Sequence, residues 1–225
     1  MKLKLVKTLL SRKPGHPHFL FSLFSLMSLV VLFELNHFNI FPLSKLWSAS
    51  GSQVFEQGQY WRAFTTTFIH ADFNHLTMNT AFFTGLTLLF STYFGWMFYP
   101  IATIVAGGLI NLVVLSFYPP QVSLVGISGV IYFMAALWLT FYVLVEKQIS
   151  LGRRLINSVG LALIFLFPQT IEPQVSYGAH AVGFALGIPT GISYYLVNRV
   201  KIKSYEVWIE LPEEPLLDFE NEENS

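Results

Sequence analysis

The sequence contains no cysteine and has few charged residues. Without cysteine, a disulfide framework, a thiolate metal site and a cysteine nucleophile are all excluded. Only 12% of the 225 residues are charged, whereas an average soluble domain carries about 25%. Half of that density cannot cover a surface that faces water, so we expect lipid to surround most of this chain.

Long apolar runs make up most of the sequence. A helix needs about 20 mostly apolar residues to cross a bilayer. Six segments meet that requirement: about 19–40, 75–94, 97–117, 128–145, 155–171 and 177–198. No small-residue cleavage pattern follows the first run, which favours a retained span over a signal peptide. The predicted fold class is therefore all-α, a polytopic membrane bundle of six transmembrane helices.

Outside these runs the chain is too short for a second domain. We expect an N-terminal tail over residues 1–18, one membrane domain over 19–200 and an acidic C-terminal tail over 201–225. Eight acidic residues and two prolines lie between Glu206 and Ser225. That composition is typical of a solvated, largely disordered end. A regulatory or partner-docking tail is the alternative.

The long connection between the first two spans, residues 41–74, is aromatic and polar. It is neither a span nor a disordered linker by composition. Aromatic rings prefer the boundary between membrane and water, and five of them are grouped here: Trp47, Phe55, Tyr60, Trp61 and Phe64.

Basic residues predict the orientation of the bundle. The N-terminal tail carries five, the loop after the fourth span carries three, and the C-terminal tail begins with three more. All three segments lie on one side if the chain crosses six times, and the other side then holds only Lys45 and Arg62. An excess of Lys and Arg marks the cytoplasmic side. Both termini are therefore predicted to be cytoplasmic.

Three polar side chains from three different spans fall at similar depths. Ser128 and His180 lie 18 and 19 residues before Glu146 and Arg199, the inner ends of their spans. A helical rise of about 1.5 Å per residue places both about 27–28 Å from the inner boundary, and Asn79 at roughly 24 Å from it. Polar groups within a membrane are costly and usually face a bundle interior or a wet cavity. One shared site toward the outer leaflet would explain all three.

Ser128 lies in Gly126-Ile127-Ser128-Gly129, at the predicted start of a span. A helix start offers free backbone N–H groups to a developing oxyanion, and the glycines allow a substrate backbone to approach. Val130 excludes the G-x-S-x-G elbow of soluble hydrolases. Taken alone, the motif also fits a close contact between helices built from small residues.

His180 is followed by Gly183, Gly187 and Gly191. Glycines four residues apart form a smooth helix face that lets a neighbouring helix come close. Such closeness is what a Ser–His pair needs for hydrogen-bond reach of about 2.6–3.2 Å. A histidine bonded to a backbone carbonyl is the alternative. No carboxylate lies near His180 within the apolar runs, so a dyad is expected, with Tyr132 as a candidate ring to stack on the imidazole.

His75 and Asn79 are four residues apart and share one face of the second span. Both can donate hydrogen bonds, as a tetrahedral intermediate requires. A metal site is the rival interpretation, but His70 and His75 are five residues apart and no H-E-x-x-H motif is present. We therefore expect no metal.

Four short motifs occur in order: Tyr60-Trp61-Arg62; His70 with His75 and Asn79; Gly126-Ile127-Ser128-Gly129 with Tyr132; and Ala179-His180 with Gly183 and Gly187. They resemble the motifs of the rhomboid family of intramembrane proteases: the Trp-Arg of its membrane-embedded first loop, its His, His, Asn cluster, its nucleophile motif and its catalytic histidine. The similarity runs from about Gln57 to Gly191, most of the chain.

The resemblance implies a serine endopeptidase that cuts transmembrane helices near the extracytoplasmic face. Ser128 would attack the scissile carbonyl, with His180 as general base and then acid. His75, Asn79 and the Ser128 backbone N–H would form the oxyanion hole. Residues 161–167 and 168–176 would cover the site. The supporting residues would be Tyr132, His70, Gly126, Trp61 and Arg62.

No cofactor follows from the resemblance. The expected partners are single-span membrane protein substrates and the lipid bilayer, with no nucleic acid. We expect a plasma (inner) membrane protein whose active site opens to the extracytoplasmic side.

Three alternatives stay open. A pseudoprotease would bind membrane clients without cutting them, although such relatives usually lack the Ser or the His. A rhombosortase-like enzyme would process C-terminal anchors. A small transporter or channel is disfavoured by the few buried charges and by the lack of an inverted repeat.

Overall fold

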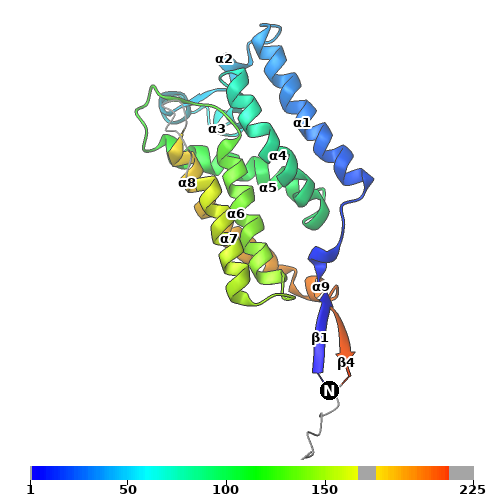
Figure 1. Ribbon diagram of the computed structural model, residues 1–225. Helices are drawn as coiled ribbons and strands as arrows, with labels where there is room; N and C mark the ends of the chain where they lie inside the picture. Colours follow the sequence, from blue (N-terminus) through cyan, green and yellow to red (C-terminus); the bar gives the residue numbers. More distant parts are fainter. Residues whose placement is uncertain (1, 167–175, 213–225) are drawn as a thin grey trace, which may run out of the picture.

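The computed structural model describes residues 2–166 and 176–212 (Figure 1). Within them, a long helix occupies each of the six predicted segments: α1 (His16–His37), α4 (Phe73–Tyr93), α5 (Phe98–Leu115), α6 (Ser128–Val145), α7 (Leu151–Leu166) and α8 (Tyr177–Val197). The all-α membrane bundle is therefore confirmed. Most ends fall within about three residues of the prediction; α7 begins earlier, and its predicted end, 167–171, lies outside the described residues.

Three of these helices are long and apolar enough to cross a membrane, namely α1, α5 and α6. The other three are more polar or shorter. Helix α4 carries His75, Asn79 and several threonines, and α7 has 16 described residues that include Arg153 and Arg154. For these helices and for α8, spanning stays a prediction from the sequence.

Helix α6 is the centre of the bundle. Its side chains Met134, Leu137 and Phe141 are completely buried, and α4, α5, α7 and α8 all pack on it (Figure 1). Helix α1 lies at the edge against α4, where the Ser22 hydroxyl donates to the Thr84 carbonyl at 2.7 Å. The apolar sequence of α6 thus fits a helix enclosed by protein on most sides.

Helix α8 packs on α6 through its glycines. A Cβ at Gly183 would overlap the Gly129 carbonyl oxygen, and one at Gly191 would lie 2.9 Å from the Leu137 oxygen. A Cβ at Gly187 would likewise overlap the Phe133 carbonyl oxygen. Any larger side chain would separate the helices, so the glycine spacing sets how closely α8 approaches α6.

The connection between α1 and α4 folds into short elements: α2 (Leu43–Trp47), β2 (Ala49–Ser50), a π-helix (Ser52–Glu56), α3 (Arg62–Thr65) and a 3-10 turn (Thr66–Phe68). Strand β2 pairs with β3 (Ser123–Leu124), which lies just before α6. The rings of Tyr60 and Trp61 are more than half exposed. Exposed aromatic rings suit the membrane–water boundary predicted for this segment.

The two ends of the chain meet at one end of the bundle. Strand β1 (Lys2–Lys7) pairs antiparallel with β4 (Val207–Leu211), with a 3-10 turn (Leu9–Ser11) and α9 (Arg199–Lys203) between them and the bundle (Figure 1). The prediction of a largely disordered tail from Glu206 onward is therefore wrong for Val207–Leu211. The pairing satisfies backbone groups that water would otherwise solvate. Residues 213–225 lie outside the described part.

The three basic segments also lie together, as the sequence predicted. Lys147, in the loop between α6 and α7, forms a 2.8 Å ion pair with Glu206. In the same loop, the Gln148 side chain donates to the Ser11 hydroxyl at 3.1 Å. The N-terminal segment, the α6–α7 loop and the C-terminal segment therefore share one side of the protein.

Candidate active site

Ser128 is the first residue of α6, at the end of the bundle opposite the termini. The turn before it depends on Gly126, whose φ of +110° is one that residues with a side chain rarely adopt. The Gly126 N–H donates to the Thr66 carbonyl at 3.2 Å, and the Thr66 hydroxyl donates to the Leu124 carbonyl. The connection thus holds the helix start, where backbone N–H groups lack intrahelical acceptors.

His180 lies in the first turn of α8, which Ser176 caps by accepting from the Ala179 N–H at 3.3 Å. A Cβ on Gly129 would lie 3.3 Å from the Ala179 oxygen. The residue after Ser128 and the residue before His180 therefore touch. Two helix starts, 52 residues apart in the chain, bring the serine and the histidine to adjacent positions.

Tyr132 stacks on His180, with ring centroids 4.0 Å apart and planes inclined by 10°. Tyr132 lies one turn after Ser128 on α6, so the stacked pair crosses from α6 to α8 beside the serine. A second ring, Tyr177, meets His180 edge-on at 5.9 Å. The stacking expected for Tyr132 is present, and its effect on catalysis stays a prediction.

The buried Nε2 atom of His180 has no hydrogen-bond partner among the described residues. In that part of the chain, no hydrogen bond joins Ser128 to His180. Catalytic hydrogen bonds are often long before substrate binds and tighten only in the complex. Within the described residues, no carbonyl therefore accepts a hydrogen bond from the Nε2 atom of His180, as the alternative of a carbonyl-bonded histidine would require there.

His75 lies against the turn that precedes Ser128. A Cβ at Gly126 would be 2.7 Å from the His75 Cε1 atom and 2.9 Å from its Nε2 atom, so only glycine leaves room for this ring. Asp72 caps α4 by accepting from the His75 N–H at 2.8 Å. Asn79 is buried and uses its amide to donate to the His75 carbonyl at 3.0 Å. Of the two, the His75 ring lies nearer the turn.

His70 is almost fully buried and meets the His75 ring edge-on at 5.3 Å. Burial lowers the pKa of His70 to about 4, so this ring is neutral at pH 7. In the described residues, neither of its ring nitrogens forms a hydrogen bond of good geometry, although the Phe68 backbone lies close enough to raise the pKa slightly against the effect of burial. A cluster able to hold a metal ion is absent from the same residues.

Two predicted supporting residues lie in the connection, away from these rings. The Arg62 guanidinium donates to the Lys45 and Ser48 carbonyls, both at 3.0 Å, while Trp61 is 55% exposed. Arg62 therefore shapes the connection, and in the described part of the chain neither side chain forms a hydrogen bond with Ser128 or His180.

Sequence reasoning missed Asn111 and Tyr118. The Asn111 amide donates to the Ala63 carbonyl at 2.7 Å and ties α5 to the connection. The Tyr118 hydroxyl lies 3.1 Å from that of Ser176, the cap of α8. An isolated Asn within an apolar span was the only signal for the first, and nothing local marked the second.

A protein family model described as the Rhomboid domain matches residues 57–197. No curated protein matches the chain. The matched region covers more than half of the chain and contains every predicted site residue from Trp61 to His180. With its apolar helices, the protein is an integral membrane protein of a family that acts on membrane proteins within the bilayer. The chain belongs to the rhomboid family.

Proposed function

We propose that this protein is an intramembrane serine endopeptidase with a Ser128–His180 dyad. One observation carries the proposal: Gly129 lies against Ala179 while Tyr132 stacks on His180. This close contact between the start of α6 and the first turn of α8 supports a dyad of the Ser128 hydroxyl and the His180 imidazole. The match to the Rhomboid domain supports the same roles.

The chemistry needs only groups that this chain supplies, plus water. As the Ser128 oxygen bonds to the scissile carbonyl carbon, its proton passes to the free Nε2 of His180. The imidazolium then gives that proton to the departing amine, and the C–N bond breaks. A water molecule, deprotonated by the same nitrogen, hydrolyses the acyl-enzyme and restores the serine.

The oxyanion that forms in both steps requires donors fixed in advance. We assign this role to the Ser128 backbone N–H, the His75 ring and the Asn79 amide. The closeness of the His75 ring to Gly126 supports the assignment. Asn79 keeps one amide hydrogen beyond the one donated to the His75 carbonyl.

We propose transmembrane helices of single-span membrane proteins as substrates. An apolar groove of about 440 Å³ lies between α4, α6 and α7. Helix α4 contributes Phe82 and Gly85, α7 contributes Leu161, and α6 forms the floor with Ala135 and Leu139. A groove lined by three membrane helices offers a substrate helix a lateral route from lipid to Ser128. The predicted cover over residues 167–175 lies outside the described residues.

Purified protein in liposomes, mixed with a single-span substrate, tests the activity. The wild type should cut the substrate near one membrane face, and Ser128→Ala should reduce cutting at least about 10⁴-fold. Equal cleavage by Ser128→Ala would refute the dyad. Mapping of the product termini separates hydrolysis from the transfer expected of a rhombosortase-like enzyme.

No hydrogen bond joins Ser128 to His180 within the described residues, so one alternative is kept, a pseudoprotease that binds clients without cutting them. The same experiment separates the two functions. A wild-type protein that captures the substrate helix, yields no cleavage product and binds as well after Ser128→Ala would be a client-binding protein.

We further propose that the termini face the cytoplasm of a plasma membrane and that Ser128 faces the opposite side. The shared position of the three basic segments supports this. Because the chain has no cysteine, Glu56→Cys and Lys203→Cys can each be labelled alone. An impermeant maleimide added to intact cells should label only the cysteine at position 56, and labelling only at position 203 would reverse the orientation.

A further inference from the structure

A polar pocket lies at the end of the bundle where the termini meet, far from Ser128. Its volume is about 140 Å³, many times the roughly 10–15 Å³ that one water requires. The turn between α4 and α5, the inner end of α8, α9 and the segment before α1 all contribute to it. The residues on which the inference rests are Arg12, His18, Trp96 and Lys201.

His18 marks this pocket as a binding site. The side chain lines the pocket and is only 8% exposed, yet its Nδ1 atom has no hydrogen-bond partner among the described residues. A buried polar atom without a partner destabilises the fold. Other polar groups in the pocket do have partners: Tyr93 donates to the Arg12 carbonyl at 2.8 Å, and Asn198 to the Tyr194 carbonyl at 3.0 Å. A ligand acceptor would satisfy the His18 ring.

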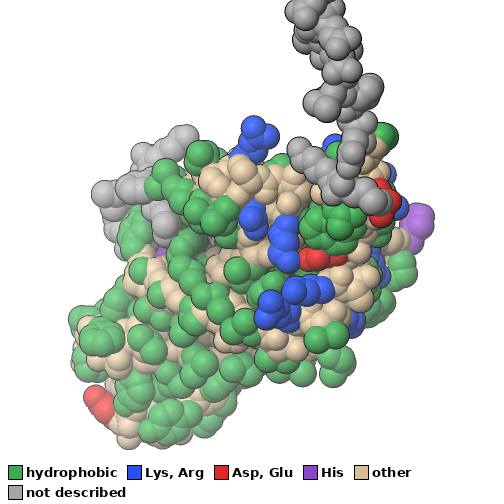
Figure 2. Space-filling view, turned by 90° about the horizontal axis from the view of Figure 1, so that it is seen from below, with side chains coloured by type: hydrophobic (Ala, Val, Ile, Leu, Met, Phe, Trp, Pro, Cys, Tyr) green, Lys and Arg blue, Asp and Glu red, His purple; other side chains and the backbone are tan. Residues whose placement is uncertain are grey.

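The charge of the pocket points to an anion. Arg12 and Lys201 line it, and no Asp or Glu does. Neither side chain forms an ion pair within the described residues, where Lys147 pairs instead with Glu206. Figure 2, which views this end of the molecule, shows Lys and Arg side chains gathered on it. Two cations with no ion-pair partner among the described residues, together with a buried ring nitrogen, suit a phosphate group.

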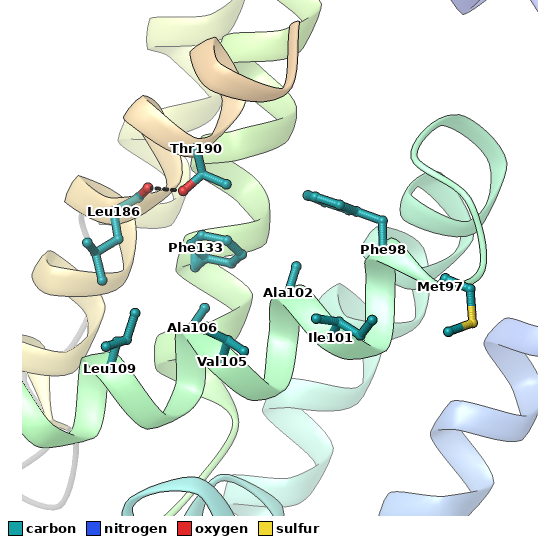
Figure 3. A pocket seen from close by; sticks show the side chains of 10 residues that line it. All are labelled: Met97, Phe98, Ile101, Ala102, Val105, Ala106, Leu109, Phe133, Leu186 and Thr190. Atoms are coloured by element: carbon teal, nitrogen blue, oxygen red, sulfur yellow. Dashed lines mark hydrogen bonds between the residues drawn. The ribbon is translucent and has the colours of Figure 1, made fainter. Parts of the chain in front are cut away.

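An apolar groove begins next to this pocket, where Met97 of the groove follows Trp96 of the pocket, and runs along the bundle. Its volume is about 350 Å³, and it runs between α5, α6 and α8 past Ala102, Val105 and Phe133 (Figure 3). The Phe98 ring in the groove contacts the Tyr194 ring of the pocket, with centroids 4.8 Å apart. The only hydroxyl in the groove, that of Thr190, already donates to the Leu186 carbonyl at 2.8 Å. The groove therefore suits an apolar ligand.

We infer that the pocket and the groove together bind one anionic phospholipid. The phosphate lies among Arg12, His18 and Lys201, and an acyl chain lies along α5 toward Phe133. A lipid tail gains little by leaving its neighbours for an apolar groove. Selectivity therefore comes from the headgroup, and phosphatidylglycerol should bind more tightly than phosphatidylcholine with the same chains.

Native mass spectrometry of the full-length protein in detergent, titrated with each lipid, tests the site. We expect one phosphatidylglycerol to bind about tenfold more tightly than phosphatidylcholine. The double variant Arg12→Gln/Lys201→Gln should lose this preference. His18→Phe, which keeps an aromatic ring beside Trp96 but removes the unpaired nitrogen, should weaken phosphatidylglycerol binding several-fold.

The matched control is Arg199→Gln/Lys203→Gln, which removes one Arg and one Lys from the same end of the molecule but outside the pocket. It should keep the preference. Equal losses in the two double variants would overturn the proposal in favour of diffuse surface charge. Equal binding of the two lipids would also overturn it, as would displacement of the lipid by inorganic phosphate at millimolar concentration, which would indicate a site for a soluble anion.

Discussion

Helices α8 and α7 both pack on α6, but they are held in opposite ways. Helix α8 presses its glycines onto the α6 backbone, so that a Cβ at Gly183 would overlap the Gly129 oxygen. Helix α7 has glycines too, yet nothing lies within 4 Å of a Cβ placed at Gly160. Its side chains face outward, with Ile156 73% and Ile164 68% exposed.

The polar contacts of α7 lie near its inner end. There the Arg154 guanidinium donates to the Val143 carbonyl, and the Asn157 amide donates to the Tyr142 hydroxyl at 3.2 Å. Farther along, Leu161 borders the groove between α4 and α7. One neighbour of α6 thus packs tightly along its glycines, while the other is fastened at one end beside an apolar groove. The proposed protease would need both arrangements, the first to position His180 and the second to admit a substrate helix.

Among changes at these two helix contacts, the largest loss of activity should come from adding one methyl group to α8. In Gly183→Ala the new carbon would overlap the Gly129 oxygen and lie 3.1 Å from the Gly129 carbonyl carbon, so the helices must separate. Misplacement of a catalytic group by about 1 Å can cost roughly 100-fold in rate. We expect kcat/KM to fall at least that far and stability to drop by about 1–3 kcal/mol.

Gly160→Ala on α7 is the matched control, measured in the same liposome cleavage and thermal unfolding assays. Its methyl group meets nothing, so activity should stay within about twofold, and helix propensity should raise stability by up to about 1 kcal/mol. Equal losses from the two substitutions would show that α8 and α7 are not held differently.

An intermediate effect is expected when the ring that stacks on His180 is removed. A stacked aromatic pair contributes about 0.5–1.5 kcal/mol beyond its buried area. Tyr132→Ala should therefore lower kcat about tenfold with little change in KM, because the imidazole loses its orientation and the substrate keeps its contacts. Tyr132→Phe retains the ring and should stay within about threefold. A raised KM at constant kcat would instead place Tyr132 in substrate binding.

The smallest loss of stability should come from a substitution at the far end of α7. Leu161 is 48% exposed, so Leu161→Ala removes few protein contacts and should lower stability by less than about 0.5 kcal/mol. Leu137→Ala in α6, where the side chain is completely buried, should cost about 2–5 kcal/mol. Thermal unfolding of both variants measures the two losses of stability. A larger loss from Leu161→Ala would mean that α7 is held as firmly as the centre of the bundle.

The helices and the close contact between α6 and α8 could be predicted from the sequence because local patterns encode both. Apolar runs of the right length mark the helices, and glycines every fourth residue after His180 indicate a close helix contact. Tyr132 follows Ser128 by one helical turn, so helical spacing alone predicts that Tyr132 lies on the same face of α6 as Ser128.

Contacts between distant segments were not predictable in this way. The alternation of Lys and Leu in β1 is typical of a strand, but its partner lies about 200 residues away, and nothing local specifies that pairing or its register. The Lys45 and Ser48 carbonyls come within reach of Arg62 only once the connection has folded. The pocket around His18 likewise forms only in the folded protein. Acidic composition alone led to the wrong prediction for Val207–Leu211.

The central claim is that the α6–α8 contact activates Ser128 through His180. Fluorophosphonate labelling of the membrane-embedded protein, with mass spectrometry to locate the adduct, measures this directly. We expect modification of Ser128 in the wild type and its loss in His180→Ala, with Gly160→Ala labelled as fast as the wild type. Labelling of Ser128 at an unchanged rate in His180→Ala, or no labelling of Ser128 in the wild type, would contradict it.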